Sequence, residues 1–323
     1  MNDVTKIARP APLPAGLHEI PPARYHADPA PSPSLSNGLA KRLIHRSAMH
    51  AWTASRRLNP DYVPETSREF DIGHAAHRAV LGAGPGWAVY PPSVLGKNGA
   101  ASTTAAKDWA AEARAHDITP IKAADEEAIL DMASAVNEAL VGAGVHLQPG
   151  RSELTGLAEI DGVWCRALFD NAPTDGDILW DLKTTTDASP DAVRAAIARH
   201  SYHLQAAHYT DIWRAITGED RRFRFVFVEK KAPFGVTIAE LHEETLAHAR
   251  RQIARARLEW RECLQTGVWP SYPLAVVTLE LSDFHHDRQL RAEIEREDWR
   301  VASGNKPSRA AITAAFAAQA PHG

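Results

Sequence analysis

Two acidic residues and a lysine follow a spacing that can support metal-assisted chemistry. Asp170 is followed, after ten residues, by the run Asp181-Leu182-Lys183. Alternate residues of a strand point to one face, so Asp181 and Lys183 would project together while Leu182 faces the core. Two carboxylates can hold a hard divalent cation, and a lysine beside them can orient or deprotonate a metal-bound water. This set of residue types therefore suits hydrolysis of a phosphodiester bond.

The local sequence places the pair at the end of a strand. An Asp-x-Lys triplet is common by chance, so the triplet alone is weak evidence of catalysis. Here the apolar residues Ile178, Leu179 and Trp180 lead directly into it. Such a run, bounded by polar residues, is typical of a buried strand. We therefore expect the charges to stand where this strand leaves the core, beside Asp170 at the end of its neighbour.

The hydrophobic periodicity predicts the elements that would position these side chains. Asp161-Gly162 between two apolar runs is a strong hairpin signal. Strands are expected over 152–160, 163–170, 177–183, 222–229 and 236–240. Helices are expected over 34–53, 65–82, 104–115, 124–142, 190–199, 201–217 and 238–266, and residues 84–106 read as a loop. This order predicts an α/β fold with a small mixed central sheet flanked by helices and helical N-terminal additions.

Composition excludes several classes of protein. The 323 residues carry 36 Lys and Arg against 40 Asp and Glu, a formal net charge of −4, which excludes a wholly basic nucleic-acid coat. A local basic groove stays compatible with this value. Two cysteines, Cys165 and Cys263, cannot build a four-cysteine zinc site or iron–sulfur cluster. No membrane-length apolar run or signal peptide is apparent, so we expect a cytoplasmic protein of a bacterial host cell.

Several runs of the sequence closely resemble one nuclease superfamily. They are GVWCRALFD, ILWDLKTTTDASPDAV, YHLQAAHYTDIW and, less specifically, YHADPAPSPSLSNGLAKRLI, FVFVEKKAPFGV and GVWPSYP. The chain is thereby similar to PD-(D/E)xK nucleases, and within them to RecE-type exonucleases (exodeoxyribonuclease VIII) and RecB-like nuclease domains of phage or prophage type. The resemblance spans about 25–273 and implies the PD-(D/E)xK (restriction-endonuclease-like) core.

The resemblance assigns roles to residues that match the family's motifs. The metal-binding carboxylates match Asp170 and Asp181, the catalytic lysine matches Lys183, and the backbone carbonyl of Leu182 would be a further metal ligand. The helix of the family that carries a Gln and a Tyr four residues apart matches Gln205 and Tyr209, which would share one helical face. Simple core packing is an equally good interpretation of Tyr209.

Two further metal-site candidates come from the same resemblance. RecB-like members carry an upstream histidine ligand, which matches His77, with His74 one turn earlier. A His-x-x-His zinc pair and a plain surface histidine are the alternatives. Glu153 matches an acidic residue of the family's first strand, is the weakest of the metal candidates, and competes with Glu159 for that role.

A DNA-degrading enzyme must grip phosphates with lysine and arginine. Lys41, Arg42 and Arg46 of the first predicted helix are one candidate set. The second set surrounds the fourth predicted strand and comprises Arg221, Arg222, Arg224, Lys230 and Lys231. For any single one of these residues, a solvated surface charge is the plainer interpretation.

The resemblance implies a Mg²⁺-dependent exonuclease acting on ends of linear double-stranded DNA, 5′ to 3′, leaving 3′ single-stranded tails for recombination. Mn²⁺ would substitute, no iron–sulfur cluster is expected, and partners would be a single-strand annealing protein and other copies of the chain, in a ring. The alternatives are an endonuclease or single-strand-preferring nuclease on the same fold, and a non-catalytic DNA-binding or assembly protein.

The expected domain organisation is one nuclease domain between two extensions. Residues 1–33 would form an extended proline-rich arm and residues 301–323 an alanine-rich tail. Between them, residues 34–300 would form the nuclease domain, with a helical N-terminal part (34–150), the catalytic α/β core (151–240) and a helical C-terminal part (241–300).

Overall fold

The computed structural model describes residues 11–64, 67–145, 147, 151–280 and 282–302. The chain divides into two compact units, Met1–Tyr272 and Pro273–Gly323. The described part of the second unit holds one helix, α10 (Asp283–Ala302). All other elements belong to the first unit, which also contains every site residue expected from the sequence.

The first unit is built around a mixed sheet. Its strands among the described residues are β1 (Gly16–His18), β2 (Leu35–Ser36), β5 (Ser152–Ile160), β6 (Val163–Asn171), β7 (Ile178–Thr185), β8 (Arg222–Glu229) and β9 (Val236–Glu240). They are ordered β1-β5-β6-β7-β8-β9, with β2 pairing with β6. The β7–β8 and β2–β6 pairs are parallel, whereas β1–β5, β5–β6, β6–β7 and β8–β9 are antiparallel. A separate two-stranded parallel ribbon joins β3 (Gly86–Val89) to β4 (Ile118–Ile121).

The predicted hairpin is confirmed and is the centre of this sheet. β5 and β6 pair from Ser152–Asn171 to Ile160–Val163. Asp161 and Gly162 both have positive φ, 55° and 74°. These values suit a two-residue turn of type I′, whose twist matches that of the flanking strands.

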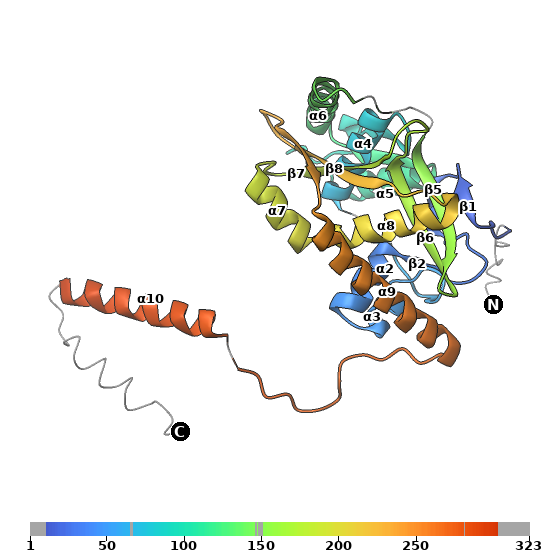
Figure 1. Cartoon of the computed structure of the whole chain (residues 1–323). Helices are drawn as coiled ribbons and strands as arrows, with labels where there is room; N and C mark the ends of the chain where they lie inside the picture. The colour runs from blue at the N-terminus through green and yellow to red at the C-terminus, as the bar shows by residue number, and fades with distance from the viewer. Residues whose placement is uncertain (1–10, 65–66, 146, 148–150, 281, 303–323) are drawn as a thin grey trace, which may run out of the picture. The chain divides into compact units, whose positions relative to one another are not determined.

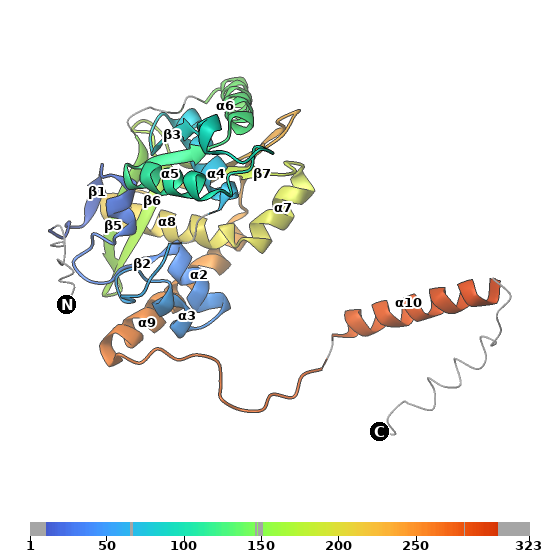
Figure 2. The same ribbon diagram turned by 180° about the vertical axis from the view of Figure 1, so that it is seen from behind.

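Helices cover both faces of the sheet (Figures 1 and 2). One side carries α4 (Arg68–Leu81), α5 (Thr104–Ala115), the short helix η1 (Pro92–Val94) and α6 (Ala123–Gly142). The other carries α2 (Asn37–His45), α3 (Ala48–Thr53), α7 (Pro190–Arg199), α8 (Tyr202–Thr217) and α9 (Glu243–Thr266). A short helix, α1 (Pro22–His26), precedes them. None of the described helices combines the length and apolar character that crossing a bilayer requires.

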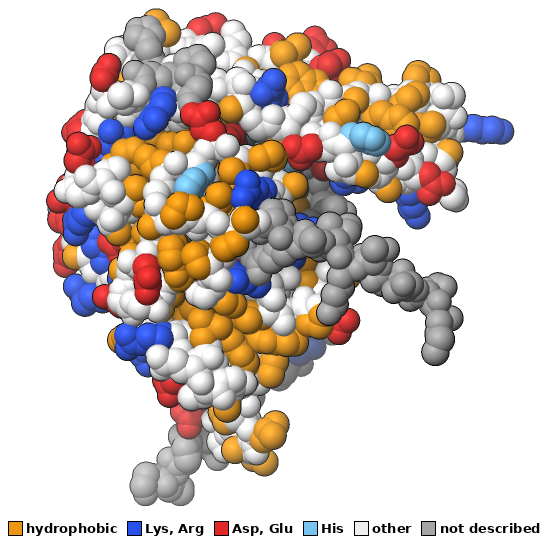
Figure 3. All heavy atoms as spheres, turned by 90° about the vertical axis from the view of Figure 1, so that its right-hand side faces the viewer, with side chains coloured by type: hydrophobic (Ala, Val, Ile, Leu, Met, Phe, Trp, Pro, Cys, Tyr) orange, Lys and Arg blue, Asp and Glu red, His pale blue; other side chains and the backbone are white. Residues whose placement is uncertain are grey.

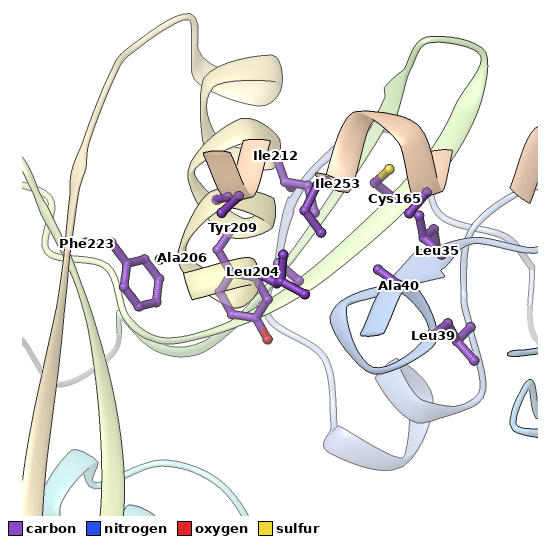
Figure 4. Close-up of a cluster of buried hydrophobic side chains, with 14 of the residues drawn as sticks. Leu35, Leu39, Ala40, Cys165, Leu204, Ala206, Tyr209, Ile212, Phe223 and Ile253 are labelled. Carbon is purple, nitrogen blue, oxygen red and sulfur yellow. The ribbon is translucent and has the colours of Figure 1, made fainter. Parts of the chain in front are cut away.

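Each face of the sheet has its own hydrophobic core. The larger core contains Leu35, Leu204 and Ile253, which meet between the sheet, α2, α8 and α9 (Figure 4). The smaller core joins α4 and α6 to β7 and β8 and includes Leu182 and Val226. Because strand residues alternate between faces, β7 places its apolar residues in both cores.

Several elements differ from the sequence-based expectation. The helix predicted over 34–53 is broken into α2 and α3, because the Ser47 hydroxyl caps a new helix by accepting the amide N–H of His50. The loop expected over 84–106 contains β3 and η1, and β4 was not predicted. The β4 run ITPI contains a proline, which argues against a strand when only the sequence is read. The helix expected from 238 begins at Glu243, because β9 continues to Glu240.

The arm expected over 1–33 is structured over its described residues. β1 pairs with β5 and thereby forms one edge of the sheet. Tyr25 is buried, and Asp28 accepts hydrogen bonds from the amide and hydroxyl of Ser34 at 2.9 and 2.6 Å. These contacts join residues 11–33 to the first unit, so over its described residues this segment is not a separate extended arm. Residues 1–10 and 303–323 lie outside the described residues.

Candidate active site

The two carboxylates meet where β6 and β7 stop pairing. These strands are joined at Asn171 and Trp180. One position further on, the carboxylate of Asp170 takes the place of a backbone acceptor and accepts the amide N–H of Leu182 at 2.7 Å. Asp170 and Asp181 are both buried there. A break between two adjacent strands therefore brings together carboxylates that are separated by ten residues in the sequence.

Asp181 is held by two side chains. Gln205 of α8 donates its Nε2 amide to Asp181 Oδ2 at 2.6 Å, and Lys183 Nζ forms an ion pair with Asp181 Oδ1. This pair confirms that Asp181 and Lys183 share a face of β7. Burial and the nearby Asp170 charge raise the pKa of Asp181 to about 6, despite Lys183. Burial lowers the pKa of Lys183, but the two aspartates outweigh it and raise the pKa overall.

Asp170 is paired with His77 of α4. His77 Nε2 lies 2.9 Å from Asp170 Oδ2, while its Nδ1 lies 2.8 Å from the carbonyl of Gly73, one turn earlier. Burial opposes protonation of His77, but the Asp170 charge prevails and raises the pKa to about 9. Burial likewise raises the pKa of Asp170, and the histidine outweighs it so that the net shift is downward. His77, and not His74, is therefore the histidine at the carboxylates.

Glu153 completes the acidic cluster. By the register of the hairpin it stands opposite Asp170, between the pairs Ser152–Asn171 and Leu154–Phe169. Its φ of 53° is a left-handed backbone conformation that interrupts the regular strand. Burial and the Asp170 charge raise the pKa of Glu153 to about 7. Glu159 pairs with Trp164 near the turn at the far end of the hairpin, so it does not belong to this cluster.

The donor set fits a magnesium ion better than a metal that needs a full protein cage. Among the described residues, no three His, Cys, Asp or Glu side chains form a metal-binding group. Mg²⁺ commonly uses one or two carboxylates, keeps several waters and takes substrate phosphate oxygens. The raised pKa values of Asp181 and Glu153 show that negative charge is crowded in a buried place, which a divalent cation would relieve.

Tyr209 lies one helical turn beyond Gln205 and is buried beside the cluster. Its ring packs edge-on against Phe169 with centroids 5.5 Å apart. Its hydroxyl hydrogen bonds with that of Tyr25 from the N-terminal segment. Burial raises the pKa of Tyr209 well above its usual value. No local sequence signal could have linked Tyr25 to Tyr209, because the two tyrosines are distant in the chain.

Tyr202, which was not singled out in the sequence, and Lys41, which was expected only as part of a basic set, both lie beside the site. Lys183 Nζ lies 5.1 Å and Lys41 Nζ 5.3 Å from the centre of the Tyr202 ring. Tyr202 precedes Gln205 by three residues on α8, so the two share a helical face. The three-residue spacing between Tyr202 and Gln205 in the YHLQ run could therefore have indicated Tyr202 as a neighbour of the site.

The arginines expected to contact DNA are engaged elsewhere. Arg221 donates to the carbonyl of Pro173 at 2.6 Å and lies over the Trp213 ring. Arg222 pairs with Asp177, and Arg224 Nε donates to Glu240 at 2.6 Å.

Arg224 also lies over the ring of Trp180, on the opposite face of the sheet from Asp181. Lys230 and Lys231 follow β8, and the amide of Lys230 donates to Thr185 at the end of β7. On the face shown in Figure 3, basic side chains are dispersed among acidic and hydrophobic ones. Of this set, only the two lysines lie at the end of β7 that carries Lys183.

The mixed sheet, its helical layers and the Asp-x-Lys strand define the PD-(D/E)xK nuclease fold. The chain belongs to the family described as "PDDEXK-like domain of unknown function (DUF3799)", whose model matches residues 48–275. Tyr25 and Lys41 lie before the matched range. No match was found among curated proteins.

Three solved structures that match this chain are described as exonucleases. A candidate exonuclease from Eubacterium rectale is 14% identical with a TM-score of 0.53, and the match covers 82% of this chain and 97% of that one. A phage-related exonuclease from Haemophilus somnus 129PT is 12% identical (TM-score 0.30; 60% and 96% covered). An alkaline exonuclease from Laribacter hongkongensis is 15% identical (TM-score 0.27; 62% and 95% covered). At these identities the likeness of the first structure shows the fold alone.

Proposed function

We propose that this protein is a metal-dependent exodeoxyribonuclease that hydrolyses phosphodiester bonds of linear double-stranded DNA. The observation that carries the proposal is the meeting of Asp170, Asp181 and Lys183 at the break between β6 and β7. These residue types are the ones that hydrolysis of a phosphodiester needs, and they stand together within a nuclease fold.

In this proposal Asp170, Asp181 and the Leu182 carbonyl would bind Mg²⁺, or Mn²⁺ in its place. His77 and Glu153 would complete the edge of this metal site. The bound ion supplies Lewis acidity and lowers the pKa of a water molecule. Gln205 fixes the carboxylate of Asp181 through its 2.6 Å hydrogen bond. Lys183 keeps its proton beside two aspartates, so its ammonium group can stabilise negative charge that develops on the phosphate.

The direction and biological setting of the proposal come from the family resemblance. We take hydrolysis to run 5′ to 3′ and to leave 3′ single-stranded tails for recombination, with a single-strand annealing protein as partner. The enzyme would act as a homo-oligomer, in a ring, in the cytoplasm of a bacterial host that carries phage-type genes. Lys230 and Lys231 would contribute to the DNA contact.

The test compares linear duplex with covalently closed circular duplex, each with Mg²⁺ and with EDTA. We expect Mg²⁺-dependent loss of the linear DNA only. Cleavage of closed circles would indicate an endonuclease, and faster loss of single strands would indicate a single-strand-preferring enzyme. If the linear duplex stays intact with Mg²⁺ while the protein still binds it, the protein is a non-catalytic DNA-binding protein and the proposal is wrong.

A further inference from the structure

Lys41 of α2 reaches the neighbourhood of the catalytic lysine from a different part of the chain. Its ammonium group donates a hydrogen bond to the carbonyl of His200 at 2.6 Å. It also lies 5.3 Å from the centre of the Tyr202 ring, the ring that Lys183 approaches at 5.1 Å. Two ammonium groups from separate elements therefore share one aromatic ring beside Asp181.

The charges of these two lysines are not balanced in the same way. Lys183 is neutralised by its ion pair with Asp181. Across the part of the chain that the structure describes, no carboxylate forms an ion pair with Lys41, whose hydrogen-bond acceptor is a neutral carbonyl. Burial and the charge of Lys183 lower the pKa of Lys41 to about 8. The Asp181 charge acts in the opposite direction but is too weak to compensate. A half-buried cation that has no ion pair among the described residues is a place where an anion would be stabilised.

We propose that Lys41 binds a backbone phosphate of the DNA strand, adjacent to the phosphodiester that is hydrolysed. The Tyr202 ring, which both ammonium groups approach, would form the protein surface between the two lysines. This inference rests on the proposed function. Because both ammonium groups lie just over 5 Å from the same ring centre, they are close enough to each other to contact successive phosphates of one strand.

Arg42 on α2 and Arg46, the residue that caps α2, were also expected to contact phosphate, but neither lies at the Tyr202 ring that Lys41 and Lys183 share. The guanidinium of Arg42 folds back on its own helix and donates to the carbonyl of Gly38 at 3.4 Å. Arg46 donates to the Tyr272 hydroxyl at 3.0 Å. Arg42 follows Lys41 directly and carries the same charge, so Arg42→Gln is a matched control for Lys41→Gln.

A purely structural role is the alternative for Lys41, because its bond to His200 also joins α2 to the turn between α7 and α8. Salt dependence separates the two roles. Each phosphate contact with a duplex contributes about 0.9 to the slope of log K against log salt concentration. Loss of a structural bond would weaken binding without changing that slope.

The experiment measures binding of a fluorescent, blunt-ended linear duplex to the full chain in EDTA, between about 50 and 200 mM salt. For Lys41→Gln we expect about tenfold weaker binding and a slope smaller by about 0.9. Lys41→Arg and Arg42→Gln should keep the wild-type slope. If Lys41→Gln has a lower melting temperature than the wild type, Lys41→Met is used in its place, because methionine retains most of the apolar stem of lysine.

An unchanged slope in Lys41→Gln, or an equal loss in Arg42→Gln, would overturn the Lys41 assignment. So would wild-type protein that does not bind the duplex. Hydrolysis of linear DNA by the wild type with Mg²⁺ is measured in parallel. If the wild type hydrolyses DNA but the Lys41→Gln slope is unchanged, only this inference fails. If the slope falls as expected without hydrolysis by the wild type, the proposed function fails and the phosphate site stands.

Discussion

Replacing Gln205 by leucine should reveal how strongly α8 controls the metal-binding carboxylate. Gln205 is buried, and its amide donates to Asp181 Oδ2 at 2.6 Å. Leucine has a similar volume but no donor, so one carboxylate oxygen would lose its partner in a buried place. A hydrogen bond to an ionised group contributes about 1.5–3 kcal/mol. Because the partner is a proposed metal ligand, we expect metal affinity or activity to fall about ten- to a hundredfold.

The assay is the initial rate of loss of linear duplex at increasing Mg²⁺ concentration. Gln205→Leu should need more Mg²⁺ for half-maximal rate, because the orientation of Asp181 is no longer fixed. Thr210→Val is the matched control, since Thr210 is also buried on α8 but donates to the carbonyl of Ala206 at 2.9 Å. A wild-type rate and Mg²⁺ dependence in Gln205→Leu would refute the reasoning, as would an equal loss in Thr210→Val.

Three further predictions concern the scaffold that supports the site. His208 is fully buried on α8, and burial lowers its pKa from 6.5 to about 3. The unfolded chain therefore binds the proton of this histidine first, and the contribution of His208 to stability falls as the pH drops below about 6.5, by about 3 kcal/mol at pH 4. The raised pKa values of Asp181 and Glu153 act in the opposite direction but are common to both proteins, so in urea unfolding the free energy of wild type relative to His208→Gln should fall by about this amount between pH 7 and pH 4; a constant difference would contradict it. Gly156→Ala would place a Cβ 2.6 Å from the Phe169 ring and should cost about 1–3 kcal/mol, seen as a lower melting temperature and not as an unchanged one. Tyr25→Phe removes the hydroxyl partner of Tyr209 and should cost about 1 kcal/mol. In a double-mutant cycle with Tyr209→Phe the two losses should not add, and full additivity would exclude the bond.

The sequence was sufficient for the part of the fold that carries the chemistry. The hairpin turn at Asp161-Gly162, the strand through Asp181 and the common face of Asp181 and Lys183 all follow from local rules, and the structure has them. The helix that carries Gln205 was predicted in the same way, whereas the choice of Gln205 and Tyr209 on it came from the family resemblance. Local periodicity works here because these elements are long and bury one side.

Other contacts of the site depend on long-range packing and could not be predicted from local pattern. Tyr25 reaches Tyr209 through a segment that reads as an extended arm, and nothing in that segment's composition predicts an edge strand. Lys41 and Arg42 have different partners because of the side of α2 that meets α8, and local pattern does not predict which side that is. Arg222 and Arg224 read as free cations in the sequence, but acidic residues from other segments bind them.

The most direct test of the account is the single-turnover rate of hydrolysis of a linear duplex with Mg²⁺ by Lys183→Met, compared with wild type. Lys183 would stabilise the reacting phosphate, and methionine keeps most of its stem without the charge. The account predicts a rate lower by a factor of about 10²–10⁴ in a protein that unfolds at the same temperature and still binds DNA. A rate close to that of the wild type would contradict the assigned active site.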